Sequence, residues 1–315
     1  MKVLVVGAGA VGQVYGHALA RGGARVTYLV KPRHADEARR GFVLYDLNRA
    51  RTPIRWSDFA VVTEPDVAGA GHDVVLLTVA SNALRVAGFL EGLAARIGDA
   101  AVVTLQPANE DRDLVARHVP EERIVVGMIG LMAYFAPLPG EELAEPGVAF
   151  WVPPLGGCPL AGPRAAPVAR VLRAGGLPAK VQRDVLGARA FGGAVLETFV
   201  TALEAAGWDR RALARDRELV ALACRGAREA ASVVERATGA RRPVAMAALC
   251  PLVARVGLGT LARVAPFDVA TFFKVHYAKI AEQRRVLAAA ERDRARTLGV
   301  ATPALDALRE RRAAA

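Results

Sequence analysis

Three glycines near the start of the chain have the spacing of a phosphate-binding turn. Residues 7–12 read GAGAVG, which satisfies G-x-G-x-x-G directly after the apolar run 3–6. In such a turn Gly7 allows a tight reversal, Gly9 lets the backbone approach a diphosphate, and Gly12 allows the following helix to pack closely. The free N–H groups at the start of that helix attract an anion. The residues predicted to hold a dinucleotide are Gly7, Gly9, Ala10, Val11 and Gly12.

Basic residues at the end of the second apolar run indicate which dinucleotide binds. The run 25–30 (RVTYLV) continues into residues 31–34 (KPRH), and no carboxylate occurs before Asp36. An NAD site usually has Asp or Glu at this place to bind the ribose 2′-hydroxyl. Cationic side chains suit a 2′-phosphate instead. We therefore expect NADP(H), bound through Lys31 and Arg33; the alternative is an ordinary basic loop.

Three polar side chains share one face of a predicted helix and are candidates for proton transfer. His276, Lys279 and Gln283 stand at positions i, i+3 and i+7, which places them on one side of a helix. Histidine titrates near neutral pH, and partial burial lowers the pKa of a lysine, so either residue can donate a proton. Lys279 would also attract a substrate carboxylate. In the alternative interpretation, His276 packs beside the aromatic residues 272–273. Lys279 then pairs with Glu282 or Gln283 in solvent.

A further candidate is Glu197, which is followed by Thr201 one turn later and by Glu204 at i+7. Apolar residues surround Glu197 in the sequence, and an unpaired carboxylate is costly to bury among them. We therefore expect a cation, Lys274 or Lys279, to pair with Glu197 and to set the pKa of an acid. The alternative is a solvated stripe on an amphipathic helix, which the spacing favours for Glu204.

Alternating strands and helices must position the glycine turn. The run 3–6, the turn, a helix over residues 14–20 and the run 25–30 form a βαβ unit within about 30 residues, and this context distinguishes a dinucleotide-binding turn from other glycine-rich turns. Further apolar runs predict strands at 73–78, 101–105, 124–129, 148–152 and 179–182, with helices at about 82–96 and from about 166. This alternation predicts an N-terminal α/β domain over residues 1–182 with a Rossmann-type, doubly wound parallel sheet.

Strand patterns disappear after residue 184. Segments rich in Ala, Leu, Arg and Glu at 185–206, 218–238, 244–264 and 267–298 predict helices. We therefore expect an all-helical C-terminal domain over residues 183–315. Gly192 and Gly193 interrupt the first of these segments, and each costs roughly 1 kcal/mol relative to alanine in a helix. Their presence suggests that the nicotinamide or a neighbouring helix approaches closely there.

Composition limits the partners that we expect. A chain of 315 residues with 53% hydrophobic content predicts two domains with large cores. No uninterrupted apolar run approaches the ~18 residues of a membrane-spanning helix. The formal net charge is +11, but the arginines alternate with Asp, Glu and Ala along helical stretches, as on solvated helix faces. We therefore expect a small-molecule substrate and neither a membrane nor a nucleic-acid partner.

Cysteine and histidine usage indicates a reducing compartment without a metal site. Cys158, Cys224 and Cys250 are scattered and form no CxxC motif, and the five histidines show no ligand spacing. The opening residues also have the outline of a signal peptide, with Lys2, an apolar run and a small-x-small end at residues 18–20. Glycines interrupt that apolar run, so we expect a cytoplasmic protein.

The order of these motifs resembles the ketopantoate reductase family, within the wider 6-phosphogluconate-dehydrogenase-like group. The matching pieces are GAGAVG followed by Tyr15-Gly16, the basic end of the second strand, DVVLLTVAS at 73–81, Leu105-Gln106, Pro146-Gly147-Val148 and LGVATP at 298–303. The resemblance covers nearly the whole chain and is most specific in the first domain. It implies a nicotinamide-dependent reduction of a 2-oxo acid, Thr78 and Gln106 beside the cofactor, a helical substrate domain, and a homodimer through that domain.

Several positions depart from the family pattern. Ala80 replaces the lysine of the family's Thr-x-Lys, residues 106–107 are Gln-Pro where the family has Asn-Gly, and Gly193 occupies the place of the general-acid lysine. The resemblance places the family's substrate-binding serine and its glutamate near Thr271 and Gln283.

We therefore predict an NADP-dependent oxidoreductase that acts on a CH–OH or CH–NH group with altered catalytic residues. It would transfer a hydride between the cofactor and a carbonyl or imine of a small carboxylate-bearing substrate. The predicted catalytic residues are His276, Lys279 and Glu197, and the predicted substrate-binding residues are Gln283, Thr271 and Thr201. The alternative is a non-redox protein on the same scaffold, either an NADP(H)-binding sensor or an acid–base enzyme.

Overall fold

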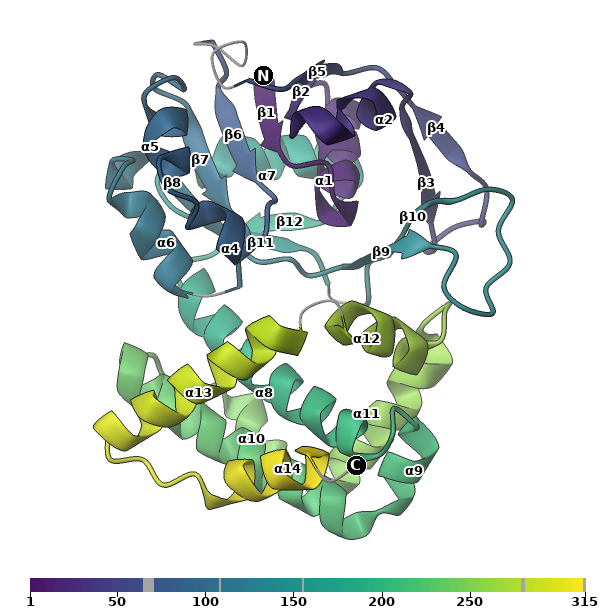
Figure 1. Ribbon diagram of the computed structural model, residues 1–315, viewed down its shortest axis with the longest axis vertical. Coiled ribbons are helices and arrows are strands. Elements are labelled where there is room, and N and C mark those ends of the chain that lie inside the picture. The colour runs from purple at the N-terminus through teal and green to yellow at the C-terminus, as the bar shows by residue number, and fades with distance from the viewer. Residues whose placement is uncertain (65–70, 108, 155, 279–280, 314–315) are drawn as a thin grey trace. The chain divides into compact units, whose positions relative to one another are not determined.

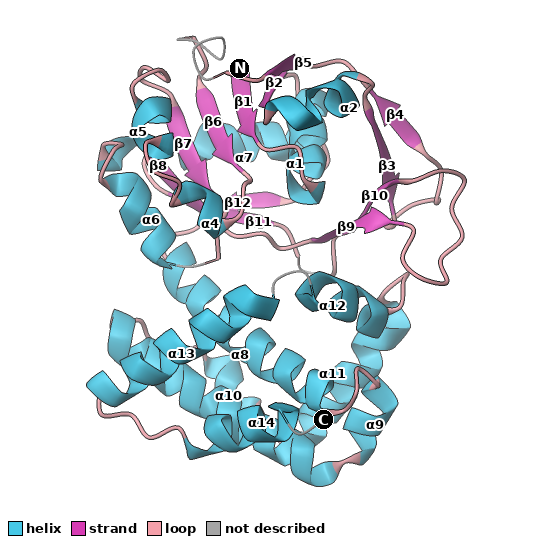
Figure 2. Ribbon diagram, in the orientation of Figure 1, coloured by secondary structure: helices cyan, strands magenta, loops and turns pink. Residues whose placement is uncertain are grey.

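The computed structural model describes residues 1–64, 71–107, 109–154, 156–278 and 281–313 (Figure 1). Contacts divide the chain into two compact units, Met1–Leu186 (unit 1) and Gly187–Ala315 (unit 2). Strands occur in unit 1, whereas the described part of unit 2 contains helices and loops (Figure 2).

Unit 1 is built on an eight-stranded sheet with the order β12-β11-β8-β7-β6-β1-β2-β5. Its strands are β1 (Lys2–Val6), β2 (Arg25–Leu29), β5 (Ala60–Val62), β6 (Val74–Leu77), β7 (Ala101–Thr104), β8 (Ile124–Gly127), β11 (Cys158–Ala161) and β12 (Ala179–Val181). Neighbouring strands run parallel except β11, which is antiparallel to β8. The strand order extends from β1 in both directions, which confirms the predicted Rossmann-type α/β fold.

Helices cover both faces of this sheet because its central strands are apolar on both sides. Val3 and Val5 of β1 pack with α1 (Ala10–Arg21) and α7 (Ala165–Ala174) in one core, whereas Leu4 and Val6 face a second core. The second core includes buried residues of α4 (Ser81–Leu84), α5 (Phe89–Ala94) and α6 (Asn109–Ala116). The single helix predicted over 82–96 is therefore wrong: two short helices occur there, and Gly88 between them has a φ of +74°.

A second sheet of four strands completes unit 1, with the order β4-β3-β10-β9. Its strands are β3 (Phe42–Asp46), β4 (Ile54–Trp56), β9 (Met132–Ala136) and β10 (Gly147–Trp151). The strand predicted at 148–152 exists as β10, but it pairs with β3 and β9 rather than with the large sheet. An apolar run indicates a strand without specifying its partner, so the sequence pattern could not separate the two sheets. Three short helices, η1 (Pro32–His34), α2 (Ala35–Arg39) and η2 (Glu121–Arg123), lie in the connections of unit 1.

Unit 2 contains most of α8 (Val185–Ala205) and seven further helices within its described residues. These are α9 (Arg210–Arg215), α10 (Arg217–Thr238), η3 (Val244–Ala248), α11 (Pro251–Val264), α12 (Val269–Ala278), α13 (Ala281–Thr297) and α14 (Pro303–Ala313). The segment predicted to be helical over 267–298 contains α12 and α13. The carboxylate of Glu229 on α10 accepts hydrogen bonds from the first backbone N–H groups of α14, at Ala304 (3.0 Å) and Leu305 (2.9 Å).

Helix α8 is the one described helix whose length and apolar composition would suffice to cross a membrane. Its residues Thr198 and Thr201 are buried, and Glu197 on the same helix pairs with an arginine of α13. These contacts are those of a core helix in a folded domain.

Candidate functional site

The glycine turn between β1 and α1 has the close backbone contacts that the sequence predicts. Gly7 has a φ of +102°, in the region that favours glycine, and its N–H donates to Leu29 O at 3.0 Å. A Cβ on Gly12 would lie 2.3 Å from Gly7 O and 2.7 Å from Thr78 Oγ1. Gly12 therefore permits α1 to start directly against the turn. A larger residue at this position would push the backbone of the turn away from α1.

The first turn of α1 is free to bind an anion. Gly9 is the N-cap in an extended conformation, no side chain caps the helix, and the first turn contains no acidic residue. A Cβ on Gly9 would meet no described atom within 4 Å. The N–H groups at the start of α1, including those of Ala10 and Val11, therefore adjoin open space. Their partial positive charge suits a diphosphate.

Two hydroxyls, of the buried Tyr28 and the half-buried Thr78, hold the turn in this shape. Thr78 Oγ1 donates to Val6 O at 3.0 Å and to Gly7 O at 2.9 Å, and Tyr28 OH donates to Gly12 O at 2.9 Å. The hydroxyl of Thr78, predicted beside the cofactor, thus hydrogen-bonds to the turn itself.

Gln106 offers an unused acceptor at the carboxyl end of β7. Its Nε2 donates to Leu77 O at 3.1 Å and to Val79 O at 2.8 Å. Its Oε1 is buried and has no hydrogen-bond partner among the described residues. A buried acceptor without a partner costs about 1–3 kcal/mol, so a bound water or a ligand N–H would stabilise this site. The uncapped start of α1 fits the diphosphate of a dinucleotide, and the unpartnered Gln106 Oε1 fits a ligand N–H such as that of an amide-bearing ring.

The two cations predicted to select the cofactor lie just after β2. Lys31 is the N-cap residue of η1, Arg33 lies within η1, and both are exposed. Arg33 Nε donates to His34 Nε2 at 3.1 Å. The hydrogen bond from Gly7 to Leu29, the last residue of β2, brings this end of β2 next to the glycine turn. Lys31 and Arg33 therefore lie at the same sheet edge as the glycine turn.

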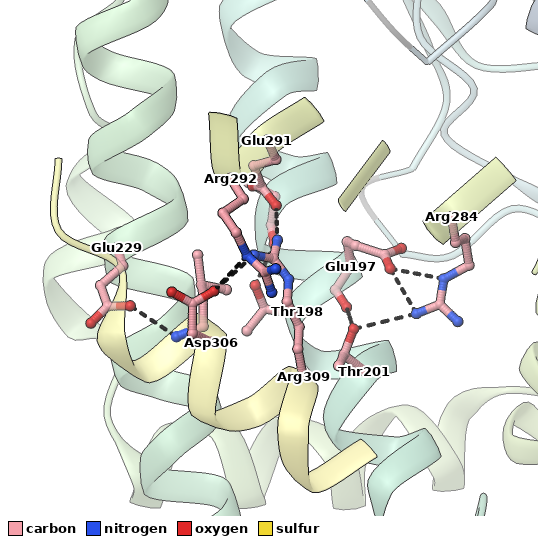
Figure 3. Close-up of polar contacts among 11 residues, drawn as sticks. Glu197, Thr198, Thr201, Glu229, Arg284, Glu291, Arg292, Asp306 and Arg309 are labelled. Carbon is pink, nitrogen blue, oxygen red and sulfur yellow. Dashed lines mark hydrogen bonds and ion pairs between the residues drawn. The ribbon is translucent and has the colours of Figure 1, made fainter. Parts of the chain in front are cut away.

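A buried guanidinium organises the polar stripe on α8 in unit 2 (Figure 3). Arg284 of α13 is 5% exposed; its Nε lies 2.8 Å from Glu197 Oε1 and its Nη1 lies 2.8 Å from Glu204 Oε2. Its Nη2 donates to Thr201 Oγ1 at 3.3 Å, and the guanidinium lies 4.7 Å from the ring centroid of Tyr277. One side chain thus binds three residues that follow one another along α8.

The structure corrects the predicted partner of Glu197. This carboxylate pairs with Arg284 rather than with Lys274 among the described residues, because a planar guanidinium reaches several acceptors at once. Burial raises the pKa of Glu197, and the hydrogen bond and charge of Arg284 oppose the rise only in part. The predicted solvated role of Glu204 is also wrong, since it binds Arg284. Thr201, predicted to bind substrate, is buried and donates to Glu197 O at 2.8 Å.

The remaining predicted residues of unit 2 lie on α12 and α13. His276 is exposed and stacks on Phe272 with ring centroids 5.7 Å apart, as in the packing alternative. The half-buried Thr271 lies at the start of α12, where its N–H donates to Asp268 Oδ1 at 2.6 Å. Lys279 lies outside the described residues, and Gln283 belongs to α13 with a side chain outside the described part.

Sequence reasoning missed Arg284, although the pattern that points to it is visible. Glu197, Thr201 and Glu204 form one acidic and polar stripe, and that stripe needs a cation. We considered only lysines for this cation. Within the described residues, no group of three or more His, Cys, Asp or Glu side chains is placed to hold a metal ion.

Comparison with known proteins supports the same fold. Residues 3–141 match the family model described as ketopantoate reductase PanE/ApbA, whereas no curated protein matches the chain. A PanE/ApbA family ketopantoate reductase structure from Ralstonia eutropha JMP134 is 24% identical, with a TM-score of 0.71 over 100% of this chain and 98% of that one. A 2-dehydropantoate 2-reductase from Geobacter metallireducens GS-15 is 18% identical, with a TM-score of 0.72 over 100% and 99%.

A structure with a different activity in its name also shares the fold. D-mandelate dehydrogenase in a ternary complex with NADH and anilino(oxo)acetate is 18% identical, with a TM-score of 0.71 over 100% of this chain and 98% of that one. At these identities the structures establish a common fold and leave the substrate of this chain open.

Proposed function

We propose that this protein, whose residues 3–141 match the ketopantoate reductase PanE/ApbA family model, is an NADPH-dependent oxidoreductase. Its substrate is a small carboxylate-bearing molecule with a carbonyl or imine group. When bound, the nicotinamide supplies or accepts the hydride. The observation that carries the proposal is the uncapped start of α1 beside Gly9, which leaves donors and space for a diphosphate.

The choice of NADPH over NADH rests on the two cations after β2. Lys31 and Arg33 are exposed at the sheet edge that carries the glycine turn, and a 2′-phosphate would be attracted to both. The 2′-phosphate of NADPH is negatively charged, whereas the 2′-hydroxyl of NADH is neutral and gains little from nearby cations.

Proton transfer and substrate binding are assigned to unit 2. We propose His276 and Lys279 as the proton donors, with Thr271 and Gln283 as substrate-binding residues. Glu197 and Thr201 contribute through Arg284, because their polar atoms are already bound to that guanidinium. A positioned acid of this kind typically contributes 10²–10⁴-fold to the rate.

We also propose that the protein is a cytoplasmic homodimer. Helix α11 exposes Leu252 (70%), Val256 (60%) and Val253 (48%) near its start, within little more than one turn. A run of large apolar side chains on one exposed helix is typical of an interaction surface, and a second copy of the chain would bury it. Sedimentation of the wild type and of Leu252→Lys/Val256→Lys tests this assignment, with a shift to monomer expected in the double variant.

The function is tested in two steps with purified protein. Binding of NADPH and NADH is first compared by the fluorescence of the reduced nicotinamide, for the wild type and for Lys31→Ala/Arg33→Ala. We expect the double variant to lose affinity for NADPH by roughly 10-fold or more, from the loss of charge-assisted hydrogen bonds, with little effect on NADH. Arg25→Ala, an exposed arginine at the other end of β2, is the matched control. Equal losses for both cofactors would contradict the assignment of these cations.

Turnover is then followed by absorbance of the nicotinamide over a panel of 2-oxo acids and cyclic imines. We expect consumption of NADPH with at least one class, and His276→Ala should lower kcat more than it changes KM. Binding of NADPH without turnover of any substrate would favour the alternative, a non-redox NADP(H)-binding sensor or acid–base enzyme. The alanine at position 80 and the glycine at position 193, where the related family has lysines, motivate that alternative.

A further inference from the structure

A cavity in unit 1 lies at the opposite end of α1 from the glycine turn. It has a volume of about 340 Å³, within the range of small-molecule sites. Val14, His17, Ala18 and Arg21 form one wall; their spacing of i, i+3, i+4 and i+7 places them on one face of α1. Every lining residue belongs to unit 1. None of them belongs to the glycine turn or to the cations after β2.

Backbone packing and side-chain hydrogen bonds hold the walls of this cavity. A Cβ on Gly175, just after α7, would lie 1.7 Å from Ala18 O, so α1 and the end of α7 pack backbone against backbone. On the other side, Asn48 binds Val152 twice, with Nδ2 donating to its carbonyl at 2.7 Å and Oδ1 accepting from its N–H at 2.8 Å. Walls held by such contacts lower the entropic cost of binding a ligand.

The charges that line the cavity favour an anion. Arg21 has no hydrogen-bond or ion-pair partner among the described residues, and its Nη1 lies 3.6 Å from the position of a Cβ on Gly176. Arg49 Nε lies 3.4 Å from Asp46 Oδ2, so the charges of these two side chains offset each other. His17 is buried, and burial together with Arg21 lowers its pKa, against the opposing charge of Asp46. The lining thus has one uncompensated positive charge near neutral pH.

The apolar part of the lining indicates the rest of the ligand. Phe150 and Val152, which are half-buried, and the exposed Pro178 contribute apolar surface beside these charges. We propose that this cavity binds a small organic monoanion, with its carboxylate on Arg21 and its apolar body against these three residues. A monocarboxylate matches the single unbalanced charge and the fork of a guanidinium. A phosphate dianion would leave one negative charge uncompensated beside Asp46.

Binding of benzoate to the full chain tests this site, with saturating NADPH present to occupy the dinucleotide site. Isothermal titration calorimetry compares benzoate with benzamide, its neutral counterpart, and with inorganic phosphate. We expect benzoate to bind at least 10-fold more tightly than either, because a charge-assisted hydrogen bond is worth about that factor or more.

Two arginine variants assign the binding to this cavity. Arg21→Leu should weaken benzoate at least 10-fold, whereas Arg25→Leu, an exposed arginine that does not line the cavity, should leave it unchanged. Thermal unfolding of both variants verifies that they fold. The proposal is wrong if benzoate fails to bind, if Arg21→Leu binds it like the wild type, or if phosphate binds more tightly. These results are independent of turnover, so they are distinguishable from a failure of the proposed oxidoreductase activity.

Discussion

Replacing Gly9 with alanine should weaken dinucleotide binding while leaving the fold intact. Gly9 has a φ of −68° and a ψ of 176°, which alanine adopts without strain. A methyl group there would meet no described atom within 4 Å, so no protein contact is disturbed. Alanine is a poorer N-cap than glycine by roughly 0.5–1 kcal/mol, and the smaller entropy of its unfolded chain offsets a similar amount.

The same methyl group would occupy the space beside the first N–H groups of α1. A diphosphate displaced by even one atom's width loses one of its charge-assisted hydrogen bonds, worth about 1.5–3 kcal/mol. That loss corresponds to roughly a 10- to 150-fold weaker affinity for NADPH. The melting temperature of the ligand-free protein should change by about 2 °C or less.

Gly12→Ala provides the matched comparison. Its methyl group would lie 2.3 Å from Gly7 O and 2.7 Å from Thr78 Oγ1, so the turn must open. Overpacking of this kind costs about 1–3 kcal/mol, and strained hydrogen bonds within the turn add to it. We expect a loss of about 3 kcal/mol, which lowers the melting temperature of the ligand-free protein by roughly 6–12 °C.

Fluorescence titration with NADPH and thermal unfolding without ligand separate the two effects. Gly9→Ala should change affinity and hardly change stability, whereas Gly12→Ala should change both. The reasoning would be refuted by wild-type affinity in Gly9→Ala, because the diphosphate would then lie elsewhere. A large loss of stability in Gly9→Ala would show that the space beside it is filled by the protein.

Three further predictions follow from the energetics of individual side chains. Arg284→Met leaves Glu197 and Glu204 without their shared cation, and because both carboxylates are partly exposed (43% and 31%) we expect a loss of about 2–3 kcal/mol in chemical denaturation. Arg296→Met, which breaks an exposed pair with Asp293, should cost about 0.5 kcal/mol or less, and equal costs for the two variants would contradict this account. Gly192→Ala and Gly193→Ala should each stabilise the protein by roughly 0.5–1 kcal/mol, because a Cβ at either position meets no described atom within 4 Å; a lower melting temperature would indicate a close neighbour there. Burial raises the pKa of the Cys158 thiol from 9.0 to about 11, so as the pH rises the unfolded chain loses this proton before the folded chain does. The free energy of unfolding is therefore unaffected by this thiol below about pH 9. Between pH 9 and about pH 11 it falls by roughly 1.4 kcal/mol per pH unit. Unfolding measured between these pH values should show this slope, and Cys158→Ala should flatten it; an unchanged slope would assign the loss to other groups.

The sequence predicted much of unit 1 because its signals are local. The glycine turn, the helix that follows and the second strand lie within the first 30 residues, and the structure has them as β1, α1 and β2. The apolar runs at 73–78, 101–105 and 124–129 likewise became β6, β7 and β8, since a strand buried on both faces needs a continuous apolar run. The second sheet was not predicted, because β3 and β10 pair across about a hundred residues of chain.

The sequence by itself therefore determined the glycine turn, whose geometry depends on the residue types at three closely spaced positions. Only the tertiary structure decided which cation balances Glu197. Arg284 lies 87 residues away along the chain, and nothing in the spacing of residues distinguishes it from the lysines nearby. Packing of α13 against α8 brings this arginine to the polar stripe, where its five N–H donors bind Glu197, Thr201 and Glu204 together. A buried charge is tolerated only where several partners meet it at once, and that condition is met in three dimensions rather than along the sequence.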